Sequence, residues 1–318
     1  MYKLGIDLGG TNIVAGVVDE NYNIAGVGKA KTRAPRPAEE VADDMAKTVF
    51  EAIENAGISI DDIDYMGIGS PGAVDAENGT VIYSSNLAFN DVALTKMMTE
   101  RVGKEFYIGN DANAAAYGEF IAGAGKGTKN FVAVTLGTGV GGGIIINGEI
   151  YTGFNGIAGE LGHFSIEMDG VICSCGRSGC WEAYASATAL IRQTKQAMNR
   201  YPESEMWNLC GGNIDNVSGL TAFNALRRGD YAAEGVVNKY IQYLATGIAN
   251  IITIFQPEII CIGGGISKEG DTLIAPLRKI VAGEKFVRNA KKKTEIKAAT
   301  LGNDAGIIGA AYLCNLYK

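Results

Sequence analysis

The feature that most constrains the fold of this chain is a glycine-rich hairpin that occurs twice. The first copy joins the apolar residues 4–8 to residues 13–18 through the turn Gly9-Gly10-Thr11-Asn12. The second copy joins residues 132–136 to residues 140–146 through the turn Gly137-Thr138-Gly139. Short apolar runs on both sides of a glycine turn are typical of strand, turn and strand. A unit that repeats within one chain predicts two lobes with a common fold.

The first glycine turn carries groups that suit a phosphate. Glycine lets backbone N–H groups approach an anion closely, and Thr11 and Asn12 add side-chain donors. A Gly-Gly pair is also ordinary turn chemistry, so the turn alone is weak evidence for a ligand. Asp7 strengthens the evidence for a ligand, because a carboxylate at the end of a buried strand is costly to desolvate, and a hydrated Mg²⁺ would offset that cost. The chain contains neither the P-loop pattern nor a glycine turn that opens a Rossmann helix.

Residues 160–182 contain the only histidine and three of the six cysteines of the chain. Cys173, Cys175 and Cys180 lie in one short turn, and His163 precedes them closely enough to act as a fourth ligand. One imidazole and three thiolates form a closed tetrahedral set for zinc, without a position for a catalytic water. Free thiols, or a disulfide with one spare cysteine, are the alternatives, but neither explains the neighbouring histidine. The sequence therefore predicts a structural zinc site.

Composition and charge limit the class of protein. The 318 residues, 47% of them hydrophobic, suffice for two lobes of ordinary domain size. We expect no signal peptide and no membrane span, since the first residues run directly into a strand and no apolar run reaches about eighteen residues. Six cysteines without an export signal favour the cytoplasm. A net charge of −7 disfavours nucleic acid as a partner, and the basic residues 291–293 are interpreted as a solvated turn.

Helical spacing is clearest in residues 38–56, where apolar side chains recur on one stripe. Residues 186–199 and 221–254 are also expected to be helices. Residues 301–313 are interpreted as the start of a further helix, with Asp304 as its cap.

The cysteine segment resembles the signature of the ROK family, which contains bacterial repressors, uncharacterised open reading frames and sugar kinases. Glu160, Gly162 and His163, the sequence CSCGRSGC at 173–180, and Glu182 carry the resemblance. It implies that the zinc is structural and that Glu160, His163 and Glu182 reach into a sugar pocket. His163 would then bind zinc with one ring nitrogen and face a sugar hydroxyl with the other.

The paired hairpins resemble those of the superfamily of sugar kinases, actin and Hsp70-type ATPases. This implies an α/β, two-lobed actin/hexokinase-like (ribonuclease H-like) fold with duplicated lobes and an interlobe cleft. The expected small lobe is discontinuous, residues 1–109 plus 303–318, and the large lobe is residues 110–302 with the zinc segment. The residues expected against ATP are Asp7, Gly9, Gly10, Thr11, Asn12, Gly137, Thr138, Gly139, Gly264 and Gly265. For the last two, a plain strand-to-helix turn stays open.

Asp111 is the candidate catalytic base. It lies between an expected strand at 106–109 and an expected Ala-rich helix at 112–122, so helix capping explains it in isolation. A sugar hydroxyl, however, is a poor nucleophile that needs a carboxylate within hydrogen-bond reach. The sequence GNDANAAA at 109–116 resembles the family motif in which this aspartate is the base. The resemblance also implies sugar contacts from Asn110, from Asn86, and from Gly72 in the turn GSPGAVD at 69–75.

These features predict an ATP-dependent hexose kinase. The motifs at 69–75 and 109–116 resemble those of glucokinase-like family members, which implies glucose, phosphorylated at its 6-hydroxyl, as the substrate. Mg²⁺ near Asp7 and the two glycine turns would offset charge on the transferring phosphoryl group. A kinase for an N-acetylhexosamine, mannose or fructose remains an alternative. So does a sugar-sensing regulator, although the first hairpin begins so early that we expect no helix-turn-helix before it. The family resemblance implies a homodimer or homotetramer.

Overall fold

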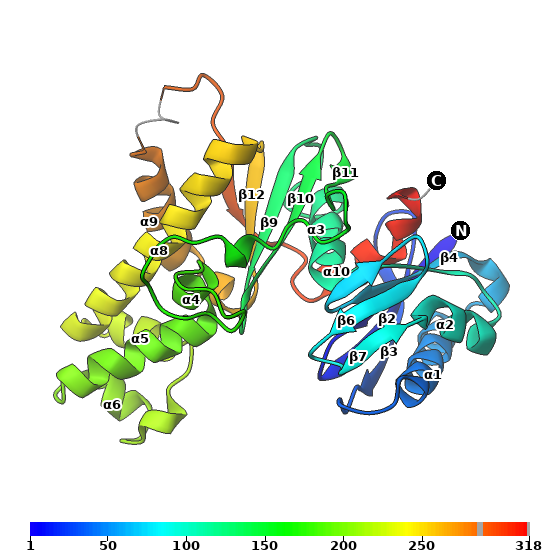
Figure 1. Cartoon of the computed structure of the whole chain (residues 1–318), viewed down its shortest axis with the longest axis horizontal. Coiled ribbons are helices and arrows are strands. Elements are labelled where there is room, and N and C mark those ends of the chain that lie inside the picture. The colour runs from blue at the N-terminus through cyan, green and yellow to red at the C-terminus, as the bar shows by residue number, and fades with distance from the viewer. Residues whose placement is uncertain (285–288, 317–318) are drawn as a thin grey trace. The chain divides into compact units, whose positions relative to one another are not determined.

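The structure, a computed structural model, describes residues 1–284 and 289–316 and is built on two five-stranded sheets (Figure 1). The first sheet has the order β3-β2-β1-β4-β8 and the second β11-β10-β9-β12-β13. When the strands of each sheet are numbered along the chain, both orders read third, second, first, fourth, fifth. The repeated hairpin of the sequence therefore opens two sheets of the same strand order.

The strands of the first sheet are β1 (Tyr2–Leu8), β2 (Asn12–Val18), β3 (Ile24–Lys31), β4 (Ile63–Ser70) and β8 (Phe106–Asn110). Those of the second sheet are β9 (Phe131–Leu136), β10 (Val140–Ile146), β11 (Glu149–Ile150), β12 (Ile259–Gly263) and β13 (Glu295–Ala298). A third, antiparallel sheet contains β5 (Ala73–Asp75), β6 (Thr80–Ser84) and β7 (Phe89–Val92).

Strand direction determines where the polar residues of the first sheet gather. β1 is antiparallel to β2 but parallel to β4, and β4 is parallel to β8. The register pairs Asp7 with Gly69 and Ser70 with Asn110. Because the carboxyl ends of parallel strands meet at one edge of a sheet, the ends of β1, β4 and β8 bring Asp7, Asn110 and the following Asp111 to the same edge.

Helix α1 (Ala38–Ala56) has the expected bounds, and its apolar stripe is buried against β2 and β3. Gly28 on β3 allows this close approach, since a Cβ there would lie 2.1 Å from the carbonyl oxygen of Thr48. Gly57 ends the helix with φ 67°, in the left-handed region that favours glycine. Helix α2 (Leu94–Val102) packs beside α1.

Helices α3 (Asp111–Ile121) and α10 (Asp304–Ala311) pack against each other, and α10 also lies against β1. Gly309 makes the close contact possible, because a Cβ there would meet the carbonyl oxygen of Ala114 at 1.7 Å. The expected capping role of Asp304 is wrong. The residue preceding the helix is Asn303, which makes no side-chain cap bond, and Asp304 is the first helical residue.

The remaining helices are α4 (Glu182–Ala185), α5 (Ala187–Arg200), α6 (Glu205–Leu209), α7 (Thr221–Arg227), α8 (Tyr231–Phe255) and α9 (Asp271–Ala282). The single helix expected over 221–254 is therefore two helices. Gly229 adopts φ 80°, and the side chain of Asp230 caps α8 by accepting from the amide of Ala233 at 2.7 Å. Short 3₁₀ turns are η1 (Ile60–Asp62), η2 (Leu161–His163), η3 (Ile214–Asn216), η4 (Gly265–Glu269) and η5 (Leu313–Leu316).

The chain forms two compact units. The first contains Met1–Val132, Gly143–Gly159 and Thr300–Lys318, and the second contains Ala133–Gly142 and Glu160–Ala299. The lobe boundaries expected from the sequence, after residues 109 and 302, stay a prediction. Within the described ranges, no helix is both long and apolar enough to cross a membrane.

Candidate active site

The first glycine turn lies at the end of β1 and closes on itself through the amide of Gly9, which donates to the carbonyl oxygen of Asn12 at 2.9 Å. A cavity of about 530 Å³ in the first unit opens in front of it. Its lining includes the five residues of this hairpin that are expected against ATP, together with a lysine and two residues at the start of α10: Asp7, Gly9, Gly10, Thr11, Asn12, Lys29, Asn303 and Asp304. The structure thus brings these candidates to one cavity, and their contact with ATP stays a prediction.

The electrostatics of Asp7 suit a cation. Burial, and then the negative charge of Asp111, raise the pKa of Asp7 to about 6. Gly306 of α10 lies close by, since a Cβ there would be 3.1 Å from the carboxylate. Two carboxylates in a desolvated corner repel each other, and a divalent cation with oxygen ligands would offset that repulsion. Asp7 therefore fits the predicted Mg²⁺ site.

Asp111 is the first residue of α3, and the structure assigns the capping role to its neighbour. The side-chain oxygen of Asn110 accepts from the amides of Ala112 at 2.9 Å and Asn113 at 3.1 Å. Oδ1 of Asp111 accepts from the adjacent amide of Ala112 at 2.8 Å. Asn110 therefore supplies the cap of α3, and the role of Asp111 as a base stays a prediction.

The three sugar candidates of the first unit lie near this edge. The side-chain amide of Asn110 donates to the carbonyl oxygen of Gly72 at 3.1 Å. Gly72 has φ 101°, and a Cβ there would lie 2.1 Å from the carbonyl oxygen of Tyr83, so the turn requires glycine. Asn86 lies beside the first glycine turn, with its Cβ 3.4 Å from where a Cβ of Gly10 would be.

The second glycine turn is held by residues of α4 and α5. The carbonyl oxygen of Gly137 accepts from the amide of Ala187, and that of Thr138 accepts from the Thr188 hydroxyl, both at 2.8 Å. The amide that follows Gly139, that of Val140, donates to Oε2 of Glu182 at 3.0 Å. These contacts come from residues about 40 to 50 positions further along the chain.

The third glycine cluster lies directly behind this hairpin. Gly264 follows β12 with φ 85°, and a Cβ there would lie 2.3 Å from the carbonyl oxygen of Leu136. Gly265 begins η4. Close packing alone therefore explains the glycine at 264, and the expected contact of Gly264 and Gly265 with ATP stays a prediction.

The predicted zinc ligands come together. His163, Cys173, Cys175 and Cys180 place one ligand atom each within 4.8 Å of one another. Nδ1 of His163 lies 3.7 Å from Sγ of Cys173, and the sulfurs of Cys175 and Cys180 are 3.6 Å apart. A disulfide requires about 2.05 Å, whereas tetrahedral zinc–thiolate bonds of about 2.3 Å place two sulfurs about 3.8 Å apart. The geometry fits zinc and not a disulfide.

Two of the three sugar candidates in the second unit lie in or next to this cluster of predicted zinc ligands: His163 is one of the ligands, and Glu182 contacts the cysteine turn. Gly162 packs on β10, since a Cβ would lie 2.3 Å from the carbonyl oxygen of Val140, and this fixes the turn that carries His163. Oε1 of Glu182 accepts from the Ser174 hydroxyl at 3.2 Å, while its Oε2 accepts from Val140. Glu182 therefore joins the cysteine turn to the second glycine turn. Glu160 is exposed.

Two threonines that support the glycine turns were missed by reasoning from the sequence. The hydroxyl of Thr188 donates to the carbonyl oxygen of Thr138, and the hydroxyl of Thr32 donates to that of Gly9 at 2.6 Å. A signal existed for Thr32: pairing the expected strand at 13–18 with a following antiparallel strand would have put it opposite Thr11. No comparable signal exists for Thr188, which reaches the turn from a helix.

Two sheets of one strand order, each opened by a glycine hairpin, define the actin/hexokinase-like class, and the expected fold class is confirmed. The chain belongs to the ROK family, whose model, described as "ROK family", matches residues 3–316. It is 40% identical over 309 residues to a glucokinase of Thermotoga maritima, covering 97% of this chain and 95% of the relative. It is 39% identical over 312 residues to a glucokinase of Streptomyces coelicolor, covering 98% and 96%.

Similarity to a solved structure supports the same family. The chain resembles the crystal structure of a ROK family glucokinase from Streptomyces griseus in complex with glucose and AMPPNP, with a TM-score of 0.82 and 37% identity. The likeness covers 98% of this chain and 99% of that one.

Proposed function

We propose that this protein is an ATP-dependent glucokinase that phosphorylates glucose at its 6-hydroxyl. The observation that carries the proposal is the position of Asp111, beside Asp7 at the edge where the first glycine turn begins, with the capping role taken by Asn110. Full-length similarity to glucokinases, at 39–40% identity, supports glucose and ATP as the substrates.

Asp111 is the general base of the proposed reaction. Its carboxylate accepts the proton of the sugar 6-hydroxyl while that oxygen attacks the γ-phosphorus in line. The new O–P bond forms as the bond between the γ-phosphorus and the β,γ-bridging oxygen breaks, and ADP leaves. Backbone N–H groups of both glycine turns donate to the phosphates. Asp7 would hold Mg²⁺, which would supply positive charge beside the transferring group.

Six residues are proposed to hold the sugar: Gly72, Asn86, Asn110, Glu160, His163 and Glu182. A site that hydrogen-bonds several hydroxyls discriminates against analogues that lack one, because its polar groups are then left unpaired. Another hexose, N-acetylhexosamine, mannose or fructose, is the alternative substrate.

Zinc is proposed to be structural. With Nδ1 of His163 facing the cysteine sulfurs, its Nε2 is left for a sugar hydroxyl, so the metal would fix both the tautomer and the ring orientation. The three thiolates and the imidazole complete a tetrahedral set, which leaves no coordination position for substrate.

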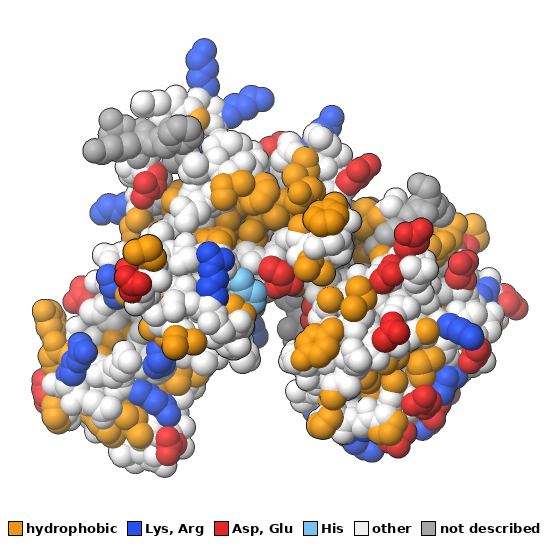
Figure 2. Space-filling view, viewed as in Figure 1, with side chains coloured by type: hydrophobic (Ala, Val, Ile, Leu, Met, Phe, Trp, Pro, Cys, Tyr) orange, Lys and Arg blue, Asp and Glu red, His pale blue; other side chains and the backbone are white. Residues whose placement is uncertain are grey.

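We propose the cytoplasm as the compartment, because none of the six cysteines forms a disulfide and ATP is the phosphate donor. On the face shown in Figure 2, Lys and Arg side chains are scattered among Asp and Glu and form no basic patch among the described residues. This, with the net charge of −7, supports small-molecule substrates and no nucleic-acid partner. A homodimer or homotetramer is proposed from the family resemblance.

A coupled assay of ADP release across a panel of hexoses tests the proposal. With ATP and Mg²⁺, glucose should give a kcat/KM at least about tenfold above mannose, fructose and the N-acetylhexosamines. A higher value for another hexose would replace glucose as the substrate. Tight sugar binding by calorimetry without ADP release from any hexose would instead indicate a sugar-sensing regulator.

A further inference from the structure

Thr32 lies behind the first glycine turn, just after β3. The β2–β3 register pairs Asn12 with Lys31 and so brings Thr32 opposite Thr11. Thr32 is fully buried. Its hydroxyl donates to the carbonyl oxygen of Gly9 at 2.6 Å, and its amide donates to that of Thr11 at 3.0 Å. Thr32 is not among the residues that line the cavity in front of the turn.

These two bonds fix the orientation of two peptide planes. In a planar trans peptide the C=O and the N–H point in opposite directions. Because Thr32 holds the carbonyl of Gly9, the N–H of Gly10 must face away from Thr32. Holding the carbonyl of Thr11 turns the N–H of Asn12 away in the same manner. The N–H groups of Gly10 and Asn12 are therefore held on the side of the turn away from Thr32 before any ligand arrives.

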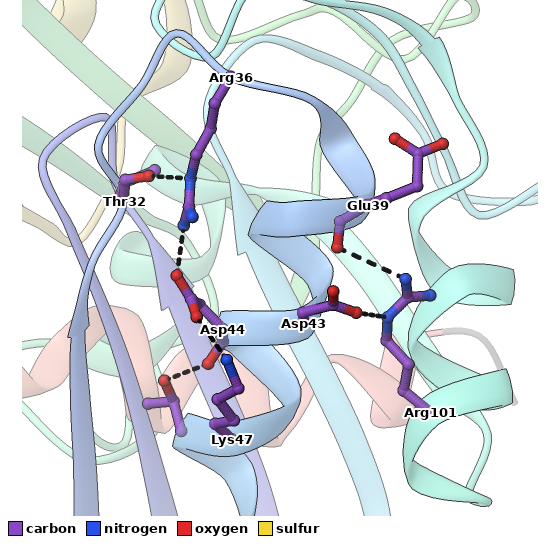
Figure 3. Close-up of polar contacts among 8 residues, drawn as sticks. Thr32, Arg36, Glu39, Asp43, Asp44, Lys47 and Arg101 are labelled. Carbon is purple, nitrogen blue, oxygen red and sulfur yellow. Dashed lines mark hydrogen bonds and ion pairs between the residues drawn. The ribbon is translucent and has the colours of Figure 1, made fainter.

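Thr32 is itself held by a charged pair, which Figure 3 shows. Nε of Arg36 donates to the carbonyl oxygen of Thr32 at 2.6 Å, and Nη2 of Arg36 lies 2.7 Å from Oδ2 of Asp44. The Arg36 side chain is only 13% exposed. Its hydrogen bond lowers the pKa of Asp44, which favours the ionised carboxylate. Asp44 sits on α1, which packs on β3, so the support reaches the core of the first unit.

We propose that Thr32 is a positioning residue for the phosphate donor. It pre-orients the Gly10 and Asn12 amides toward the nucleotide phosphates, and Arg36 with Asp44 holds Thr32 in place. Pre-oriented donors cost no reorganisation when the ligand binds, so loss of Thr32 weakens nucleotide binding and leaves sugar binding unchanged. The inference rests on the proposed function in one respect, that the first turn binds ATP phosphates.

Thr32→Val tests the inference, because valine keeps the shape and the backbone amide but removes the hydroxyl. We expect the dissociation constant of ATP, measured calorimetrically, and its KM to rise about tenfold, with KM for glucose changed less than about twofold. Thr32→Ser, which keeps the hydroxyl, should restore most of the affinity.

Thr48→Val is the matched control. Thr48 is 1% exposed, and its hydroxyl donates to the carbonyl oxygen of Asp44 at 2.6 Å within α1, away from the turn. Both variants lose one buried hydroxyl bond, so both should lose thermal stability, but only Thr32→Val should lose nucleotide affinity. Equal effects of the two on ATP binding would overturn the inference.

Arg36→Met provides a second test if Thr32→Val does not fold. Its control is Lys47→Met, which removes the other cation on Asp44, 3.1 Å away and 77% exposed, without touching Thr32. Arg36→Met should raise the dissociation constant of ATP about threefold and Lys47→Met should not. Wild-type protein that binds ATP but phosphorylates no hexose would refute the proposed function only, while the ratio between each variant and its control still decides the role of Thr32.

Discussion

The two glycine turns are supported alike in one respect and differently in another. In each, a threonine hydroxyl donates to a turn carbonyl, Thr32 to Gly9 at 2.6 Å and Thr188 to Thr138 at 2.8 Å. Thr32 is fully buried and directly follows β3, next to the Asn12–Lys31 pair of the sheet. Thr188 is exposed at the start of α5.

The second turn has an additional support. Glu182 accepts from the amide of Val140 and from the hydroxyl of Ser174, next to two predicted zinc ligands. The first turn is therefore ordered by its own sheet and by the Arg36–Asp44 pair at α1, whereas the order of the second depends in part on the cysteine turn. A second difference lies in charge. Burial of Asp7, and then the negative charge of Asp111, raise the pKa of Asp7 beside the first turn.

The largest expected effect concerns Asp111, and it tests whether the base belongs to the first unit. Asp111→Ala should lower kcat at least about 100-fold while glucose and ATP still bind, because positioning does not need the base. Steady-state kinetics and calorimetry measure the two effects. Asp271→Ala is the control, since Asp271 is also the first residue of a helix and is exposed. A variant at 111 that keeps more than about a tenth of wild-type kcat would sink the assignment.

Removing a zinc ligand tests the difference in support. Cys175→Ala should release the metal, seen by elemental analysis, and weaken glucose binding about 10- to 100-fold, because His163 and Glu182 lose their fixed geometry. ATP binding should change much less. Cys210→Ala is the control, because Cys210 is a buried free thiol outside the cluster. Wild-type protein free of zinc, or a zinc-free variant with normal glucose phosphorylation, would contradict the role given to the cysteine turn.

The sequence was sufficient where the signal is contiguous. Both hairpins, helix α1 and the clustering of the four candidate zinc ligands were predicted, because spacing alone encodes strands, helical stripes and clustered ligands. Contacts over long sequence separations were not predicted. The break at Gly229 requires a left-handed residue that the surrounding apolar pattern hides, and Thr188 reaches Thr138 only through tertiary packing. The capping of α3 by Asn110, and not by Asp111, depends on which of two adjacent cap-forming residues is first in the helix.

Burial of Asp7, together with the nearby negative charge of Asp111, predicts a pH-dependent stability. The pKa of Asp7 is raised to about 6 from 3.8, so its stabilising contribution is fully present below about pH 4 and is lost as the pH rises through 6. Asp7→Asn should therefore make the protein, free of nucleotide and metal, more stable at pH 7.5 by about 2 kcal/mol, and equally stable near pH 4. Chemical denaturation at both pH values measures this.

Asp75→Asn is the control of opposite sign for this measurement. Hydrogen bonds from Asn78 lower the pKa of Asp75, so its contribution is present at neutral pH and is lost as the pH falls. A loss of stability at pH 7.5 in Asp7→Asn would mean that Asp7 has a compensating partner in the folded protein.

The smallest expected effect sharpens the comparison between the two threonines. Thr188→Val removes the hydroxyl that holds Thr138, but the amide of Ala187 still holds Gly137, and water can reach the exposed carbonyl that is freed. KM for ATP should therefore rise only about threefold, less than in Thr32→Val, where the Gly9 carbonyl is left without its buried donor. Thr246→Val is the control, because this exposed hydroxyl donates to the carbonyl oxygen of Gln242 within α8. If Thr188→Val weakened ATP binding as much as Thr32→Val, burial would not distinguish the two supports, and the second turn would depend on α5 as strictly as the first depends on its sheet.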